Sequence, residues 1–125
     1  MKLCLLTYNL GKDMSLDELI RVTEAYGYDG IEFRAGVGPH GVELEATPEQ
    51  RAEIKAKLDA SRVEAAGIGT SCRFEDLDPA VRQKHIDDAK AYIDLAASIG
   101  CPRIRVFGNA FPEGSDKDEV IENVG

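Results

Sequence analysis

The sequence predicts an α/β fold made of parallel (βα) repeats, with four βα units in succession. Four short runs of β type alternate with four amphipathic helical segments at intervals of roughly 30–40 residues, which is the pattern of successive βαβ crossovers. Two of the runs also carry a charge on every second residue, so that one face of each is polar. The expected strands are Lys2–Tyr8, Gly30–Arg34, Val63–Gly69 and Arg103–Phe107.

Capping signals mark the start of each helix. In two of them a Ser or Thr is followed three residues later by Glu or Gln, a capping box in which the two residues satisfy each other's free backbone N–H groups. The third helix is the longest and should end at Gly100. Its buried face is expected to hold Ile86, Ala89, Ile93 and Ala96. The four start signals are Ser15 with Glu18, Thr47-Pro48 with Gln50, Asp78-Pro79, and Ser115 with Asp118.

The composition indicates one domain over residues 1–125 and disfavours several classes of partner. The 125 residues are 43% hydrophobic and carry a net charge of -8 with the cations spread along the chain, which argues against nucleic acid or an anionic membrane as partner. No apolar stretch approaches the ~20 residues of a membrane-spanning helix. The three cysteines form no C-x-x-C motif, so we expect a cytoplasmic protein without disulfides.

Alternation within the second and fourth strands distinguishes two architectures. Ile31, Phe33, Ile104 and Val106 should face the helices, and the opposite face would carry Glu32, Arg34, Arg103 and Arg105. Burying unpaired charges costs several kcal/mol, so the opposite face must be a polar interior, a ligand cleft or a salt-bridged core. This favours half of a closed barrel. The alternative is an open doubly wound sheet, for which 125 residues is a suitable length.

Polar residues follow the carboxyl ends of all four strands. In a parallel α/β barrel the βα loops at that end converge on one opening, where function resides. The alternative is that these are ordinary polar loop residues. We expect one substrate-binding cleft bordered by Asn9, Glu32, His40, Ser71, Arg73, Arg105 and Asn109. No catalytic residue is assigned.

Two of these residues carry more specific expectations. Glu32 should face the interior and pair with Arg34 or Arg105, either to fix packing or to bind substrate. His40 lies in a glycine-rich loop over residues 36–41, where an imidazole could contact substrate or move a proton. A solvated loop histidine is the alternative.

Four motifs in order resemble the xylose isomerase-like TIM-barrel superfamily, a group of sugar phosphate isomerases and epimerases with apurinic endonuclease as a nucleic-acid branch. The resemblance covers essentially the whole chain, as the first four βα units of the family's barrel. The motifs are Ala25-x-Gly27-x-Asp29-Gly30-Ile31-Glu32, His40-Gly41-Val42-Glu43-Leu44, Gly69-Thr70-Ser71-Cys72-Arg73-Phe74, and Leu95-Ala96-x-x-Ile99-Gly100-x-x-x-Ile104-Arg105-Val106-Phe107-Gly108.

The resemblance implies a metal-dependent isomerase or epimerase that moves a proton through an enediolate on a small sugar or hydroxy-carbonyl substrate. In the family a divalent metal (Mn, Mg, Co or Zn) is held by a Glu, an Asp, a His and a second Glu from later strands. The metal ligands are therefore expected outside this chain, which would supply the substrate side of the opening. A polyol dehydratase on the same barrel, or a non-catalytic half-barrel for binding or assembly, are the alternatives.

Length implies that such a barrel is incomplete in this chain. Eight βα units need at least ~200 residues, so a half-barrel has to be completed. The first and last strands would also present unpaired edges, which promote further strand pairing. We expect either a longer protein whose C-terminal half is missing here or a homo-oligomer.

Overall fold

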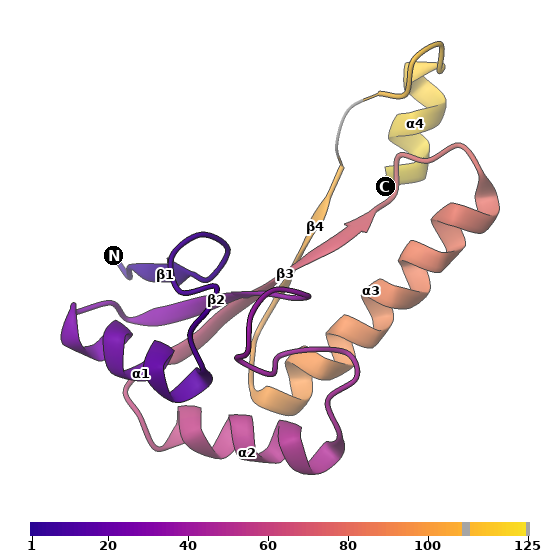
Figure 1. The fold of residues 1–125 in the computed structure, drawn as a ribbon. Coiled ribbons are helices and arrows are strands. Elements are labelled where there is room, and N and C mark those ends of the chain that lie inside the picture. The colour runs from indigo at the N-terminus through magenta and orange to yellow at the C-terminus, as the bar shows by residue number, and fades with distance from the viewer. Residues whose placement is uncertain (109–110, 125) are drawn as a thin grey trace.

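The computed structural model describes residues 1–108 and 111–124, and it shows a parallel four-stranded sheet with helices between the strands (Figure 1). The strands lie in the order β1-β2-β3-β4. This confirms the predicted class of four βα units, and the sequential order contradicts the doubly wound alternative, in which the strand order reverses. The elements are β1 (Cys4–Leu6), α1 (Leu16–Ala25), β2 (Gly30–Arg34), α2 (Pro48–Asp59), β3 (Glu64–Arg73), α3 (Pro79–Ile99), β4 (Ile104–Phe107) and α4 (Lys117–Val124).

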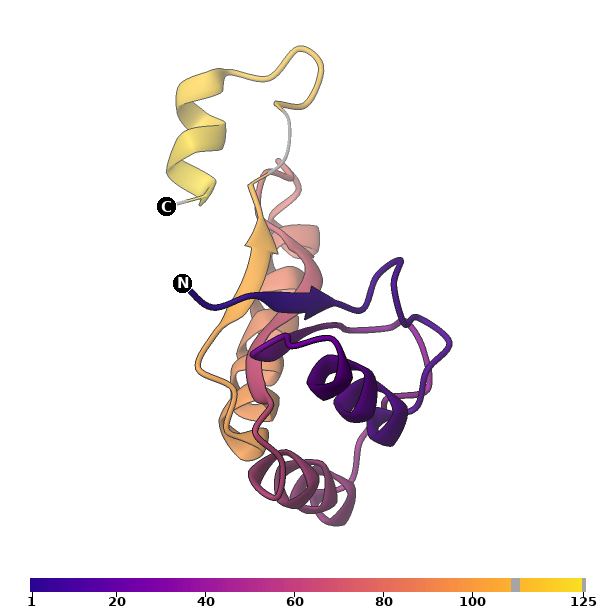
Figure 2. The same ribbon diagram turned by 90° about the vertical axis from the view of Figure 1, so that its left-hand side faces the viewer.

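The helices α1, α2 and α3 lie on one side of the sheet (Figure 1). Parallel strands joined by right-handed crossovers in sequential order place every connecting helix on the same face. Figure 2 shows how strongly the sheet twists, with β1 crossing β4 steeply. Such twist between neighbouring strands is the geometry from which a barrel closes. We call the face opposite these three helices the open face.

The core lies between the sheet and these helices. Ile31 and Phe33 of β2 and Ile68 of β3 are 0% exposed and pack with Leu19 of α1 and Leu95 of α3. The predicted inward direction of Ile31 and Phe33 is therefore confirmed. Burying a large apolar side chain of this kind contributes about 1.5–3 kcal/mol.

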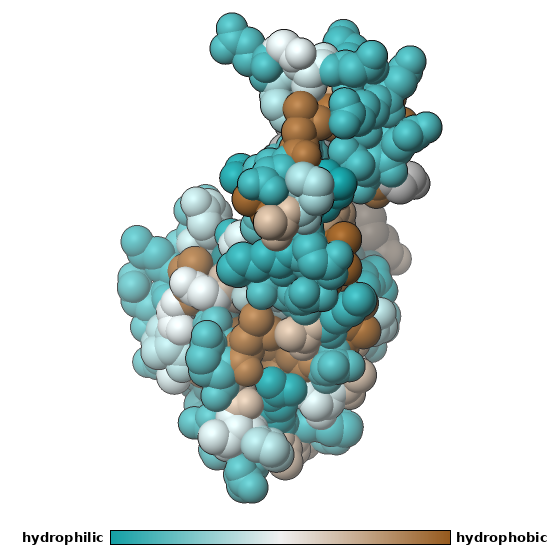
Figure 3. All heavy atoms as spheres, turned by 90° about the vertical axis from the view of Figure 1, so that its right-hand side faces the viewer, coloured by the Kyte–Doolittle hydropathy of each residue, from teal (hydrophilic) through white to brown (hydrophobic). Residues whose placement is uncertain are grey.

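The predicted buried face of α3 is wrong at one position. Ile93 is 54% exposed, whereas Leu95 and Ile99 are buried, because the helix turns a stripe centred on those two residues toward the sheet. Figure 3 shows this side of the molecule, where apolar groups form small patches in a mainly hydrophilic surface. No helix among the described residues combines the length and apolar character needed to cross a membrane.

The capping signals mostly form as predicted. Both capping boxes are present, and Gly100 ends α3 with a left-handed φ of 76°. The start of α4 is different. The Ser115 hydroxyl donates to the Pro112 carbonyl oxygen, and it is the Asp116 carboxylate that accepts from the backbone N–H of Asp118, so the helix begins at Lys117. A carboxylate one residue closer to the helix takes the capping role.

Candidate functional site

An ion pair on the open face links two strands that are not neighbours. Nε of Arg105 on β4 lies 2.9 Å from Oε1 of Glu32 on β2, with β3 between them. This confirms the predicted interior direction of Glu32 and identifies Arg105 as its partner. The side chains of Arg105 and Glu32 are 41% and 31% exposed, so the pair is only half-buried in the described chain.

Two glycines of β3 make room for this ion pair. Gly67 is in register with Glu32, and Gly69 is in register with both Arg34 and Arg105. A Cβ atom at position 69 would lie 2.6 Å from Nη2 of Arg105 and 3.3 Å from Oε1 of Glu32. The β3 strand therefore presents bare backbone, over which the flanking strands extend their side chains. Sequence inspection missed this role, although glycines at every second position of a strand were a signal for it.

Arg34 lies beside the pair and has a different set of partners. Its Nη1 donates to the carbonyl oxygen of Gly69 at 3.0 Å, and its Nη2 donates to the Ser71 hydroxyl at 3.2 Å. The guanidinium carbon is 6.0 Å from the centre of the Tyr8 ring. Among residues 1–108 and 111–124, no carboxylate forms an ion pair with Arg34, which leaves its charge uncompensated at short range.

An irregularity in β3 directs the next side chains. Gly69 pairs with Arg105, but the following pair is Arg73 with Phe107, so β3 holds two extra residues between them. The Thr70 hydroxyl stabilises this bulge by donating to the Arg105 carbonyl oxygen at 2.9 Å and accepting from the Cys72 backbone N–H at 3.1 Å. Bulges of this kind re-aim side chains at the ends of strands. Beyond this bulge β3 continues to Arg73, past the predicted end at Gly69, and pairs again with β4 at Phe107.

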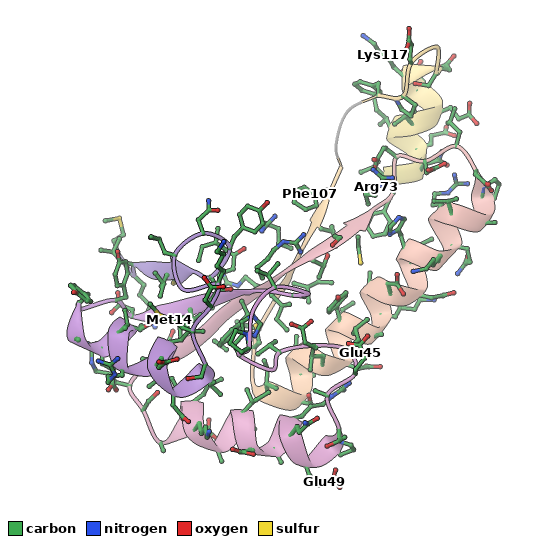
Figure 4. All side chains as sticks on the ribbon, in the orientation of Figure 1. Met14, Glu45, Glu49, Arg73, Phe107 and Lys117 are labelled. Carbon is green, nitrogen blue, oxygen red and sulfur yellow. The ribbon has the colours of Figure 1, made fainter. Side chains whose placement is uncertain are left out.

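The bulge helps to form an open pocket of about 440 Å³ at the carboxyl end of the sheet. Two predicted site residues, Ser71 and Arg73, line it together with residues that were not predicted. Figure 4 shows Arg73 and Phe107 at the far ends of β3 and β4. Nε of Arg73 is also 3.7 Å from Oε1 of Glu75. The lining residues are Arg34, Ser71, Arg73, His85 and Phe107.

His85 was missed because it lies in a helix, away from any strand end. In a βα unit the first turns of the helix lie next to the carboxyl end of the preceding strand. His85 is in the second turn of α3, which begins at Pro79. Its place near the start of α3 could therefore have predicted that His85 lies beside the carboxyl end of β3.

His40 does not join this group, which contradicts its predicted place in the cleft. Its side chain is 2% exposed, and its ring lies 5.4 Å from the Phe33 ring on the helix-covered side of the sheet. Nδ1 accepts from the Val42 backbone N–H at 3.1 Å, so Nε2 carries the proton and donates to the Arg34 carbonyl oxygen at 3.2 Å. Burial lowers the pKa of His40, which favours the neutral imidazole. The alternative of a solvated loop residue is also wrong.

Asn9 is not among the described residues that line the pocket. Asn9 is exposed after β1 and makes no hydrogen bond with another described residue. Asn109 lies outside the described residues. The structure thus brings together Glu32 with Arg105, and Ser71 with Arg73. Arg34 binds Ser71 and the Gly69 carbonyl oxygen, and Gly69 is also in register with Arg105.

Comparison with protein families identifies the fold. A model described as xylose isomerase-like TIM barrel matches residues 20–125. The chain belongs to the xylose isomerase-like TIM-barrel family. The resemblance seen in the sequence motifs is confirmed. A comparison with curated proteins finds no match.

Several solved structures contain this arrangement of strands and helices. The IolI protein, whose crystal structure has a bound zinc atom, matches 98% of this chain with a TM-score of 0.75 and 16% identity. The probable 3-DHS dehydratase AsbF of Bacillus anthracis matches 86% with a TM-score of 0.59 and 20% identity. A xylose isomerase domain protein of Planctomyces limnophilus matches 96% with a TM-score of 0.62 and 21% identity.

These similarities show the shared fold, and they also show its extent. The chain spans 43% of the IolI structure, 38% of AsbF and 46% of the Planctomyces limnophilus protein. It therefore corresponds to less than half the length of each.

The described residues do not fit a metal centre of their own. Among residues 1–108 and 111–124, no three His, Cys, Asp or Glu side chains lie close enough together to hold a metal ion. Oε1 of Glu32 is bound by Arg105, and both ring nitrogens of His40 are used in backbone hydrogen bonds. Around the Glu32–Arg105 pair, the described residues present guanidinium donors and the Glu32 carboxylate on the open face.

Proposed function

We propose that this chain forms the substrate-binding half of a sugar isomerase or epimerase. The reaction would move a proton between adjacent carbons of a small sugar or hydroxy-carbonyl compound through an enediolate. The observation that carries this proposal is the convergence of Glu32, Arg34, Ser71 and Arg105 on the open face at the carboxyl ends of β2, β3 and β4. In TIM-barrel enzymes the active site is built at that end of the strands.

The geometry suits a ligand rich in hydroxyl and carbonyl oxygens. A guanidinium presents five N–H donors in a fixed fork, and Arg34 and Arg105 are both held in place by protein acceptors. The Glu32 carboxylate accepts hydrogen bonds from substrate hydroxyl groups. These residues bind and orient the substrate in the proposed enzyme.

The divalent metal of the proposed enzyme (Mn, Mg, Co or Zn) has its ligands outside this chain. The bound zinc of the IolI structure supports a metal in this family. The four βα units are completed by a C-terminal half or by a second copy of the chain in a homo-oligomer, which agrees with the share of the solved structures that is covered. The cysteines Cys4, Cys72 and Cys101 are all free, which fits the reducing cytoplasm.

Deuterium exchange tests the proposed reaction directly. The full protein is incubated with Mn²⁺ and a panel of aldoses, ketoses and cyclic polyol ketones in D₂O, and NMR follows the carbon-bound protons. An isomerase or epimerase incorporates deuterium at the carbon next to the carbonyl group. Loss of water with a new conjugated carbonyl product would instead identify a polyol dehydratase. Binding without exchange or product would identify a non-catalytic half-barrel.

A pair of variants assigns the reaction to the open face. Arg105→Gln removes the cation that holds Glu32, and Arg21→Gln removes the same charge from the exposed surface of α1. Exchange should fall at least about tenfold in Arg105→Gln, which corresponds to about 1.4 kcal/mol of lost transition-state binding. Arg21→Gln should exchange like the unchanged protein. Equal loss in both variants would argue against the proposed site.

A further inference from the structure

The open pocket at the ends of β3 and β4 concentrates positive charge in an acidic chain. The chain has a net charge of -8, yet Arg34 and Arg73 both line this pocket. We infer that it binds an oxyanion, a phosphate or carboxylate group carried by the small substrate. This inference rests on the proposed function and narrows its substrate class to acidic sugars or sugar phosphates.

Arg34 is prepared for an anion by neutral partners. Its Nη1 donates to the carbonyl oxygens of Gly69 and Ala35, at 3.0 and 3.3 Å, and its Nη2 donates one hydrogen bond to the Ser71 hydroxyl. Carbonyl and hydroxyl oxygens hold the side chain in one orientation without neutralising it. Because a guanidinium has five N–H donors, Nε and the second hydrogen of Nη2 remain for a ligand. A charged hydrogen bond to an oxyanion is among the strongest in proteins.

Arg73 supplies the second cation. Its side chain is 49% exposed, and its one ion pair among the described residues is the Nε contact of 3.7 Å with Glu75, longer than a hydrogen bond. Arg73 lines the pocket, and no hydrogen bond from its terminal nitrogens to another described residue is present. None of the described lining residues is acidic, so Arg34 and Arg73 give this lining a positive charge.

The remaining lining residues set the size and shape of the ligand. Phe107 is 36% exposed, and the centre of its ring is 5.0 Å from the Arg105 guanidinium carbon. Such a ring packs against the apolar face of a sugar or short carbon chain. His85 adds an imidazole that can donate a further hydrogen bond. A volume of about 440 Å³ lies within the range of small-molecule sites and suits one small acid.

A small molecule fits these observations better than nucleic acid. Phosphate backbones are bound by extended series of cations, each releasing a counterion. Here two arginines converge on one pocket while the rest of the chain is acidic.

Isothermal titration calorimetry on the full protein, without added metal, tests the inference with inorganic phosphate and with glycolate as probes. Arg73→Gln should weaken binding of the preferred probe at least about tenfold, because one charged hydrogen-bonding partner is lost. Arg73→Lys keeps the charge, so its affinity for the probe should lie between those of the unchanged protein and Arg73→Gln. Arg21→Gln, which removes a charge far from the pocket, should bind as tightly as the unchanged protein. The tighter probe distinguishes a phosphate-bearing from a carboxylate-bearing substrate.

Two outcomes overturn the inference: neither probe binds, or Arg73→Gln binds as well as Arg21→Gln. Circular dichroism of each variant shows whether it is folded. If Arg73→Gln does not fold, the comparison of Arg73→Lys with the unchanged protein tests the inference instead. Failure here is distinguishable from failure of the proposed function. Deuterium exchange on neutral sugars without anion binding would remove only the inference, whereas anion binding without exchange would remove only the isomerase.

Discussion

The two faces of strand β2 carry opposite kinds of residue on one continuous backbone. Ile31 and Phe33 are 0% exposed and packed beneath the helices, while Glu32 and Arg34 extend over bare backbone on the open face. Because successive side chains of a strand point to opposite faces, every second residue can serve stability and the others can serve binding. In this strand, alternate residues therefore divide the two tasks: one set packs the core and the other set forms the candidate binding face.

His40 shows that residue type alone does not assign a side chain to the chemical face. Its imidazole belongs to the stability side, where it fastens the loop before α2 to the end of β2 through the Arg34 carbonyl oxygen. The Arg34 side chain serves the other face. One residue of β2 thus belongs to the core through its backbone and to the candidate site through its side chain.

The largest effect is expected from emptying the helix-covered face. Phe33→Ala should lower the free energy of unfolding by about 3–5 kcal/mol, because it leaves a cavity in a fully buried layer. Urea denaturation followed by circular dichroism measures this loss. A loss below about 1 kcal/mol would mean that the two faces do not differ in their contribution to stability.

A smaller effect is expected on the open face of the same strand. Glu32→Ala should cost about 1–2 kcal/mol, between the values for exposed and for buried ion pairs, since the side chains of the pair are 31% and 41% exposed. A double-mutant cycle with Arg105→Ala isolates the coupling between the two side chains. Additive effects of the two substitutions would show that the contact contributes nothing to stability.

The burial of His40 on the helix-covered face predicts that the free energy of unfolding depends on pH. Burial lowers the pKa of His40 below its ordinary value of 6.5, so the unfolded chain binds the proton more readily than the folded chain. This contribution is fully present above pH 6.5, and stability should fall as the pH drops below that value by at most about 1.4 kcal/mol per unit.

Urea midpoints at pH 7.5 and pH 5.5 measure the dependence. His40→Gln should flatten it, because the buried imidazole is then absent from the folded chain. If His40→Gln loses stability between pH 7.5 and pH 5.5 as steeply as the unchanged protein, His40 is not the source of the pH dependence.

The smallest effect on stability is expected from the glycine that separates the paired side chains. Gly69→Ala places a Cβ atom against the movable end of Arg105, so stability should change by less than about 1 kcal/mol. The Glu32–Arg105 contact should nevertheless be lost, and with it the coupling in the double-mutant cycle. Gly30→Ala is the contrasting control, because its Cβ would lie 2.7 Å from the Glu64 backbone oxygen and should cost about 1–3 kcal/mol. If Glu32 and Arg105 remain coupled in the Gly69→Ala background, their contact does not need the space left by the missing side chain at position 69.

Much of the fold was predictable because its signals are local. The bounds of β2 agree with the prediction residue for residue, and both capping boxes form, since each depends on groups within four residues of one another. The partnership of Glu32 with Arg105 was predictable only as one of two options, because parity shows a shared face and says nothing about distance across strands.

The sequence by itself determined the βα order, the alternation of the strands and the helix starts, through period, capping and turn chemistry. Only the tertiary structure decided which polar residues meet. The bulge between Gly69 and Arg73 turns Ser71 toward Arg34, and the path of the loop buries His40 against Phe33. The Ser71–Arg34 contact joins positions 37 residues apart, which no local pattern specifies. His40 lies only six residues from Arg34, but its burial depends on how the loop folds back against the core, which residue type and spacing do not reveal.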